Sequence, residues 1–126
     1  FLLWISFRGL RRWRRNTYRR QALRELADID RAGPGAAAGI PVLLKRAALS
    51  AWTRPEVARL SGPEWHQFLD RTAGTDRFRA GGAGALMDRL AYAGRAGMAV
   101  SADEFRQLHG AAEFWLKNHR PEATAP

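Results

Sequence analysis

The three histidines of this 126-residue chain are its best candidates for acid–base or metal chemistry. None of His66, His109 and His119 belongs to an HExxH motif, in which two histidines on one helix face bind zinc. His109 and Glu113 are four residues apart, so they could share a helix face. One such pair is too few for a metal site, which takes three or four protein ligands. The spacing therefore favours a surface hydrogen bond, and the sequence predicts no metal and no cofactor.

A second candidate is the glycine-rich stretch Gly81-Gly82-Ala83-Gly84, whose composition is that of a phosphate-binding loop. It lacks the Gly-Lys-Ser/Thr ending that supplies a lysine and a magnesium ligand, and no predicted strand precedes it. No serine lies in a Gly-x-Ser-x-Gly elbow. The carboxylates are scattered among arginines, as on a solvated face, and no pair stands out for acid–base work. These patterns predict a protein that is not an enzyme, and a hydrolase is the weakest of the alternatives.

The most distinctive segment is an arginine run close to the start of the chain, without any acidic residue. Its members are Arg8, Arg11, Arg12, Arg14, Arg15, Arg19 and Arg20. They supply most of the formal net charge of +9, so the rest of the chain is nearly balanced. The basic character is therefore local, which argues against a domain that coats nucleic acid with its whole surface.

The segment that precedes this run, 1–7, is almost entirely apolar. Seven residues are too few for a spanning helix, which needs about 20. A signal peptide carries its charge before its apolar part, whereas here the charge follows. The pattern predicts the end of a transmembrane helix whose upstream part is missing, with the arginines on the cytoplasmic side. The expected membrane-interface residues are Trp4, Arg8, Arg11, Arg12, Trp13, Arg14 and Arg15. A nucleic-acid-binding arm and a solvated amphipathic helix are the alternatives.

The elements that must position these residues are all helical. No proline or glycine interrupts 10–32, which predicts one long helix that ends at Gly33-Pro34-Gly35. We expect an anchor end and basic juxtamembrane helix over 1–32, a Gly/Ala/Pro linker over 33–40, a cytoplasmic helical domain over 41–120 and a disordered tail over 121–126. The predicted fold class is all-α: a long N-terminal helix leads into a compact bundle of three to five helices.

Apolar spacing and capping signals place the helices inside this bundle. The i, i+3, i+4 pattern predicts a buried face over 40–51 and another over 105–116. Capping boxes are predicted at Ser61–Glu64 and Ser101–Glu104. The stretch 41–69 could pass for a helix-turn-helix, but its second helix offers only His66, Gln67 and Arg71 to DNA, so DNA recognition is not favoured.

The order of these landmarks resembles a known family. The segments that carry the resemblance are "RRWRRNTYRRQALREL" at 11–26, "VLLKRAALSAWTRPEVARLSGPEWHQFLD" at 42–70, "FRAGGAGALMDRLAY" at 78–92 and "WLKNHR" at 115–120. The chain resembles a bacterial family of small single-pass membrane proteins of unknown function. Their genes lie beside those for MoxR-type AAA+ ATPases and von Willebrand factor A proteins of the aerotolerance (Bat) type. Members usually have a complete transmembrane helix, and the family transfers no catalytic residues.

The resemblance implies an accessory role in an assembly at the bacterial inner membrane. We therefore expect a non-enzymatic, single-pass adaptor whose cytoplasmic domain binds MoxR-type ATPase or von Willebrand factor A proteins. The alternative function is a nucleic-acid-binding helical domain that uses the Arg8–Arg20 helix. Trp52, Trp65 and Trp115 lie on or beside apolar faces, so core packing is the default for them. If aromatic residues dock a protein partner, the candidates are Trp52, Phe78 and Tyr92.

Overall fold

The computed structural model is all-helical over the residues that it describes, which are 2–79, 82–92 and 100–121; within 2–16, the only side chain described is that of Leu3. The helices are α1 (Leu2–Ala32), α2 (Gly39–Ala51), α3 (Arg54–Ala58), α4 (Gly62–Ala73), α5 (Ala83–Tyr92) and α6 (Ala102–Asn118). A short 3-10 turn over Pro34–Ala36 joins α1 to α2. The predicted all-α class is thus confirmed. No helix in the described part of the chain is both long enough and apolar enough to cross a bilayer.

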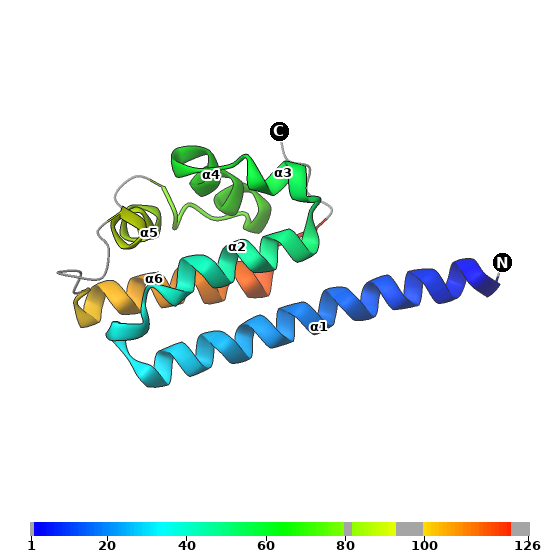
Figure 1. The fold of residues 1–126 in the computed structure, drawn as a ribbon, viewed down its shortest axis with the longest axis horizontal. Helices are drawn as coiled ribbons and strands as arrows, with labels where there is room; N and C mark the ends of the chain where they lie inside the picture. The colour runs from blue at the N-terminus through cyan, green and yellow to red at the C-terminus, as the bar shows by residue number, and fades with distance from the viewer. Residues whose placement is uncertain (1, 80–81, 93–99, 122–126) are drawn as a thin grey trace.

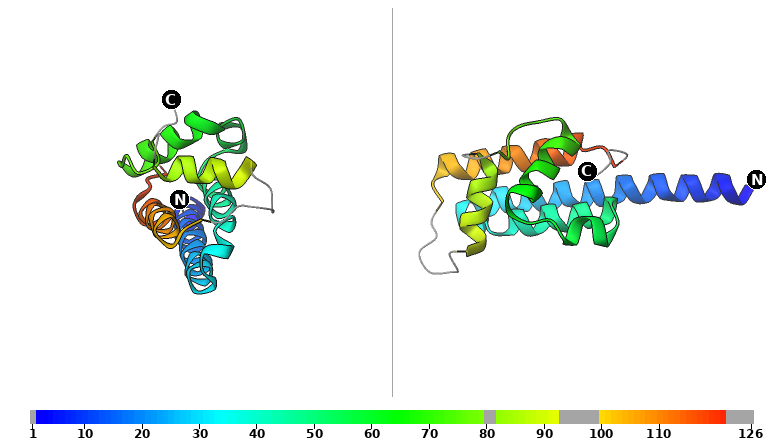
Figure 2. Two further views of the ribbon diagram at one scale, coloured as in Figure 1. Left: turned by 90° about the vertical axis from the view of Figure 1, so that its left-hand side faces the viewer. Right: turned by 90° about the horizontal axis from the view of Figure 1, so that it is seen from above.

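Helices α1, α2 and α6 run along the long axis of the molecule, and α5 lies across them (Figure 1, Figure 2). The three long-axis helices contact one another, and α6 also contacts α4 and α5. The first half of α1 extends beyond the other helices, whereas its second half packs against α2 and α6 (Figure 2). The molecule is therefore a compact body with one projecting helix.

The core forms around α6, as its apolar spacing predicts. Leu108, Ala112, Trp115 and Leu116 have no exposed surface, and Phe105 has very little. The indole nitrogen of Trp115 donates a hydrogen bond to Thr72 Oγ1 of α4 over 2.9 Å, and that hydroxyl donates to the Phe68 carbonyl. Buried polar groups without partners are costly, so this chain of hydrogen bonds fixes α4 in one register on α6.

A clasp of Tyr18, Arg19 and His119 ties α1 to the end of α6. Tyr18 Oη lies 2.6 Å from His119 Nε2, and the Arg19 guanidinium donates to the carbonyls of Lys117 and His119, each over 3.1 Å. His119 is almost fully buried, stacks on Trp115, and donates from Nδ1 to the Trp115 carbonyl. Arg19 of α1 therefore adds a cation at the negative end of the α6 dipole, beside Lys117 of α6 itself.

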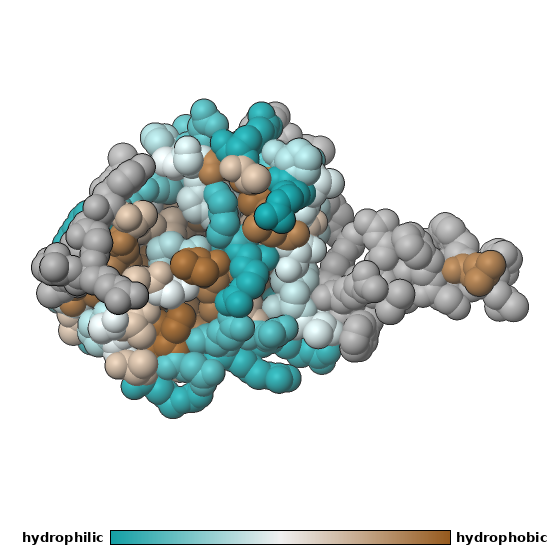
Figure 3. All heavy atoms as spheres, viewed as in Figure 1, coloured by the Kyte–Doolittle hydropathy of each residue, from teal (hydrophilic) through white to brown (hydrophobic). Residues whose placement is uncertain are grey.

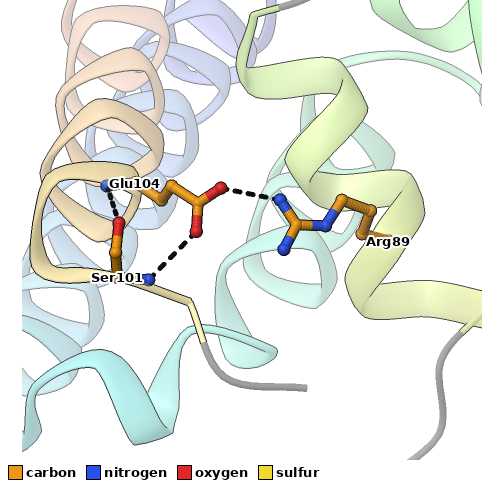
Figure 4. Close-up of polar contacts among 3 residues, drawn as sticks. All are labelled: Arg89, Ser101 and Glu104. Carbon is orange, nitrogen blue, oxygen red and sulfur yellow. Dashed lines mark hydrogen bonds and ion pairs between the residues drawn. The ribbon is translucent and has the colours of Figure 1, made fainter. Parts of the chain in front are cut away.

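The capping predictions had a mixed outcome. The box at Ser101–Glu104 is present, with both of its hydrogen bonds at 3.0 Å (Figure 4). The box at Ser61–Glu64 is wrong, because the Ser61 side chain makes no capping hydrogen bond. Gly62, which follows Ser61, has a φ of +53°, outside the helical range, so the chain does not enter α4 with the geometry that a capping box needs.

Glu104 also links two helices, because its second carboxylate oxygen accepts from Arg89 of α5 over 2.7 Å (Figure 4). The Ser101 amide, and then Arg89, hold the pKa of Glu104 below its ordinary value of 4.5. A carboxylate with a lowered pKa stabilises the folded state above its ordinary pKa, and this contribution is lost as the pH falls through the folded-state pKa.

We therefore expect Glu104→Gln to lower the melting temperature at pH 7, and the difference from wild type to shrink as the pH falls below 4.5. Thermal denaturation, followed by circular dichroism at about five pH values from about 3 to about 7, measures the two melting temperatures. Glu113→Gln is the matched control on the same helix. Glu113 makes a long, exposed contact of 3.8 Å with Lys117, so its replacement should change the melting temperature little. A difference that does not change with pH would contradict the assignment.

Candidate functional site

A half-open pocket of about 760 Å³ lies between α4, the loop residues 74–79 and α5. We call it the α4–α5 pocket. Its walls carry His66, Gln67, Asp70 and Arg71 from α4, Thr75 and Arg79 from the loop, and Asp88 from α5. The α4 residues line it because positions three and four apart share one side of a helix. The opposite side of α4, with Phe68, Leu69 and Thr72, faces the core.

A contact between His66 and Asp88 joins the two helical walls. His66 Nε2 lies 3.2 Å from Asp88 Oδ1, and the His66 side chain is 10% exposed against 43% for Asp88. The other ring nitrogen, Nδ1, lies against Gly84, where an added Cβ would be only 2.6 Å from it. His66 therefore joins the two helical walls through Nε2, and its nearly buried ring shapes the pocket beside Gly84.

Asp70 occupies the inner wall of the pocket. Its Oδ1 accepts a hydrogen bond from the Phe78 amide over 2.9 Å, which holds the loop against α4. Burial raises the pKa of Asp70, while the hydrogen bond from Phe78 and the nearby charge of Arg79 partly oppose that rise. The side chain is only 9% exposed, and in the described part of the chain its second oxygen has no hydrogen-bond partner. The pocket therefore presents a carboxylate oxygen that can accept a hydrogen bond from a ligand.

The predicted docking aromatics are not at this site. As docking candidates, Trp52 and Phe78 were expected on the surface, and that expectation is wrong: Trp52 is 9% exposed and Phe78 is fully buried. Trp52 meets Phe68 edge to face, with ring centroids 4.9 Å apart, because a large aromatic ring gains most from burial. The Tyr92 side chain lies outside the described residues.

The membrane-interface residues and His109, which the sequence also singled out, are likewise not among the described residues that line the pocket. The side chains expected at a membrane interface, Trp4, Arg8, Arg11, Arg12, Trp13, Arg14 and Arg15, lie outside the described ones, although their backbone belongs to α1. The surface hydrogen bond expected for His109 is not formed: its Nε2 is buried without a partner in the described structure, and the ring packs near Phe105. No group of three potential metal ligands occurs among the described residues.

Sequence reasoning singled out His66, Gln67 and Arg71, but only as candidates for DNA contact. It missed Asp70, Arg79 and Asp88, which no motif connects. The four-residue spacing of His66 and Asp70 was the one available signal. That spacing places both residues on one side of α4 but says nothing about the return of α5, which completes the pocket.

The fold is a small helical body, with a pocket beside α4, that is carried on a long helix whose sequence is basic. The chain belongs to the family described as "Domain of unknown function (DUF4381)", which matches residues 1–118. The comparisons found no matching curated protein and no matching solved structure.

Two glycines give a matched test of how closely α5 approaches α4. A Cβ on Gly84 would collide with the Phe78 carbonyl and His66 Nδ1, whereas a Cβ on Gly110 of α6 would meet nothing within 4 Å. We expect Gly84→Ala to destabilise the protein by about 1–3 kcal/mol, as overpacking does. Gly110→Ala should stabilise it by about 0.5–1 kcal/mol, because alanine favours a helix. Urea unfolding measures both, and equal effects of the two variants would contradict the close approach.

Asp70 accepts a hydrogen bond from the Phe78 amide and carries a charge that burial disfavours, and two substitutions separate these effects. Asp70→Asn keeps an oxygen for the Phe78 amide and removes a charge that burial disfavours, so its melting temperature at pH 7 should equal or exceed that of wild type. Asp70→Ala leaves the amide unpaired and should cost about 1–3 kcal/mol. Because the pKa of Asp70 is raised, its contribution to stability falls as the pH rises above its ordinary value of 3.8. The advantage of Asp70→Asn over wild type should therefore grow between pH 3.8 and pH 7, and a shrinking advantage would refute the assignment.

Proposed function

We propose that this protein is a non-enzymatic adaptor, anchored in the bacterial inner membrane by the helix to which α1 belongs. Its helical body would lie in the cytoplasm and bind protein partners of a MoxR-type ATPase and von Willebrand factor A system. The observation that carries the proposal is the unbroken course of α1 from the apolar start of the chain, through the arginine run, to the half that packs on the body.

The length of α1 gives this arrangement its physical meaning. Its 31 residues extend over about 46 Å at about 1.5 Å per residue, and the first half projects from the body (Figure 1). Arginines beside an apolar segment favour the cytoplasmic side of a membrane and attract anionic headgroups. With the apolar end in lipid, the projecting half would hold the body clear of the bilayer surface.

The clasp supports a fixed orientation of the body on its anchor. Tyr18 and Arg19 follow directly after the densest part of the arginine run, and both contact the end of α6. Because packed protein interiors deform little, contacts at this point would hold the body at a fixed angle to α1. This property suits a protein that presents one surface to partners near the membrane.

Two features of the body support a binding role. His66 Nε2 contacts Asp88 Oδ1 where the two pocket walls meet, so this ring helps to hold the charged pocket in shape. On the face shown in Figure 3, the apolar residues among the coloured atoms form separate patches that hydrophilic residues divide. That face therefore offers no broad apolar surface among its coloured atoms, and the charged α4–α5 pocket is a candidate for specific recognition.

The nucleic-acid alternative depends on the same arginine run. Arg19 donates to the carbonyls of Lys117 and His119 at the end of α6, so these donors are not available to a phosphate. An arm of this kind would bind DNA or RNA with an affinity that falls steeply as salt rises.

The test uses the full-length gene product, expressed at native level in its own bacterium. We expect the protein to stay in the membrane fraction after an alkaline wash, and in-cell cross-linking to recover a MoxR-type ATPase or a von Willebrand factor A protein. An unrelated single-pass protein with the same tag is the control. Release by the alkaline wash would overturn the anchor, and recovery of neither partner would overturn the adaptor role. Cross-linking mainly to DNA or RNA would favour the alternative.

A further inference from the structure

We propose that the α4–α5 pocket is the docking site for a basic side chain, lysine or arginine, presented by a segment of a partner protein, with Asp70 as its counter-ion. The proposal rests on the proposed function only in taking the partner to be a protein. The chemistry of recognition comes from the pocket itself.

Asp70 is positioned to bind a cation. It lies at the inner wall of the pocket, with nine-tenths of its surface buried. One carboxylate oxygen is held by the Phe78 amide, which fixes the direction of the other. No ion pair to Asp70 occurs among the described side chains, and Arg79 influences it only at longer range. A buried carboxylate gains most from a partner that brings both a positive charge and hydrogen-bond donors, as lysine and arginine do.

A second carboxylate faces the same space from the other wall. Asp88 of α5 is half-exposed, and its contact with His66 fixes it in place. Two acidic groups from different helices therefore flank the pocket, while its two arginines, Arg71 and Arg79, are both exposed. The charge pattern is negative inside and positive towards solvent. A segment whose basic residue lies between acidic neighbours is complementary to this pattern.

The size of the pocket agrees with a peptide segment. About 760 Å³ is within the range of about 300–1,000 Å³ that is typical of ligand pockets. That volume is larger than one side chain requires, so neighbouring residues of the segment can enter as well. The half-open shape leaves a path for the backbone of the segment to pass along the edge of the pocket.

Protein NMR with small probes tests this site without knowledge of the partner. The isotope-labelled chain of residues 1–126 is titrated with N-acetyl-arginine methylamide, with the tripeptide acetyl-Glu-Arg-Glu-amide, and with putrescine. N-acetyl-norleucine methylamide is the uncharged control. We expect saturable amide shifts around Gln67, Thr75 and Ala85, a dissociation constant on the order of 1 mM for blocked arginine, and tighter binding of the tripeptide.

Asp70→Asn should weaken the binding of both arginine probes at least about tenfold, because it removes the charge and keeps the hydrogen bond to Phe78. Asp76→Asn is the matched control, because Asp76 is an exposed acid of the same loop that does not line the pocket. Unchanged amide shifts in Asp70→Asn, outside the immediate site, confirm that the fold is intact.

Three outcomes would overturn the proposal: no saturable shifts with blocked arginine, equal binding to wild type and Asp70→Asn, or putrescine binding as tightly as the tripeptide. The last result would make the pocket a site for small amines. These failures are distinguishable from failure of the adaptor role, because the titration needs neither membrane nor partner, and the cross-linking experiment does not depend on Asp70.

Discussion

The buried hydrogen bond from Trp115 to Thr72 is the contact on which the rest of the structure depends. It joins α6 to α4 in the centre of the core. The Thr72 hydroxyl also donates a hydrogen bond to the Phe68 carbonyl. The Thr72 carbonyl accepts one from the amide of Arg120, just beyond the end of α6. Trp115 also supports the stacked ring of His119, which contacts Tyr18 of α1. One buried indole therefore fixes both the wall of the pocket and the direction of the projecting helix.

The position of α4 explains why a pocket exists beside it. One side of α4 is committed to the core through Phe68, Leu69 and Thr72, so its polar side is left for the loop and α5 to cover. Asp70 holds the loop through the Phe78 amide, and Gly84 allows α5 to approach His66 closely. The result is an opening lined by charged groups, of which Asp70 is held by the Phe78 amide and Asp88 contacts the nearly buried His66.

The clasp and the pocket belong to one connected set of helices. Arg19 and Tyr18 act on the end of α6, whereas the α4 wall of the pocket is joined to α6 through Thr72. In the proposed adaptor, a partner that binds at the pocket would therefore be held in a defined direction from the membrane. This arrangement requires no catalytic group, since what it supplies is position. It also gives a physical reason for the long helix, which sets the distance between lipid and pocket.

The sequence alone determined the all-α class, the buried faces of α2 and α6, the end of α1 at Gly33 and the cap at Ser101, because helical periodicity and end signals are local. It favoured core packing for Trp52 but also left it, with Phe78, as an exposed docking candidate: both lie near turns, and the tertiary packing decides that both are buried. The pocket was likewise decided by the tertiary structure. Asp70 and Asp88 are 18 positions apart, and their shared space depends on the return of α5 across α4, which no local pattern encodes.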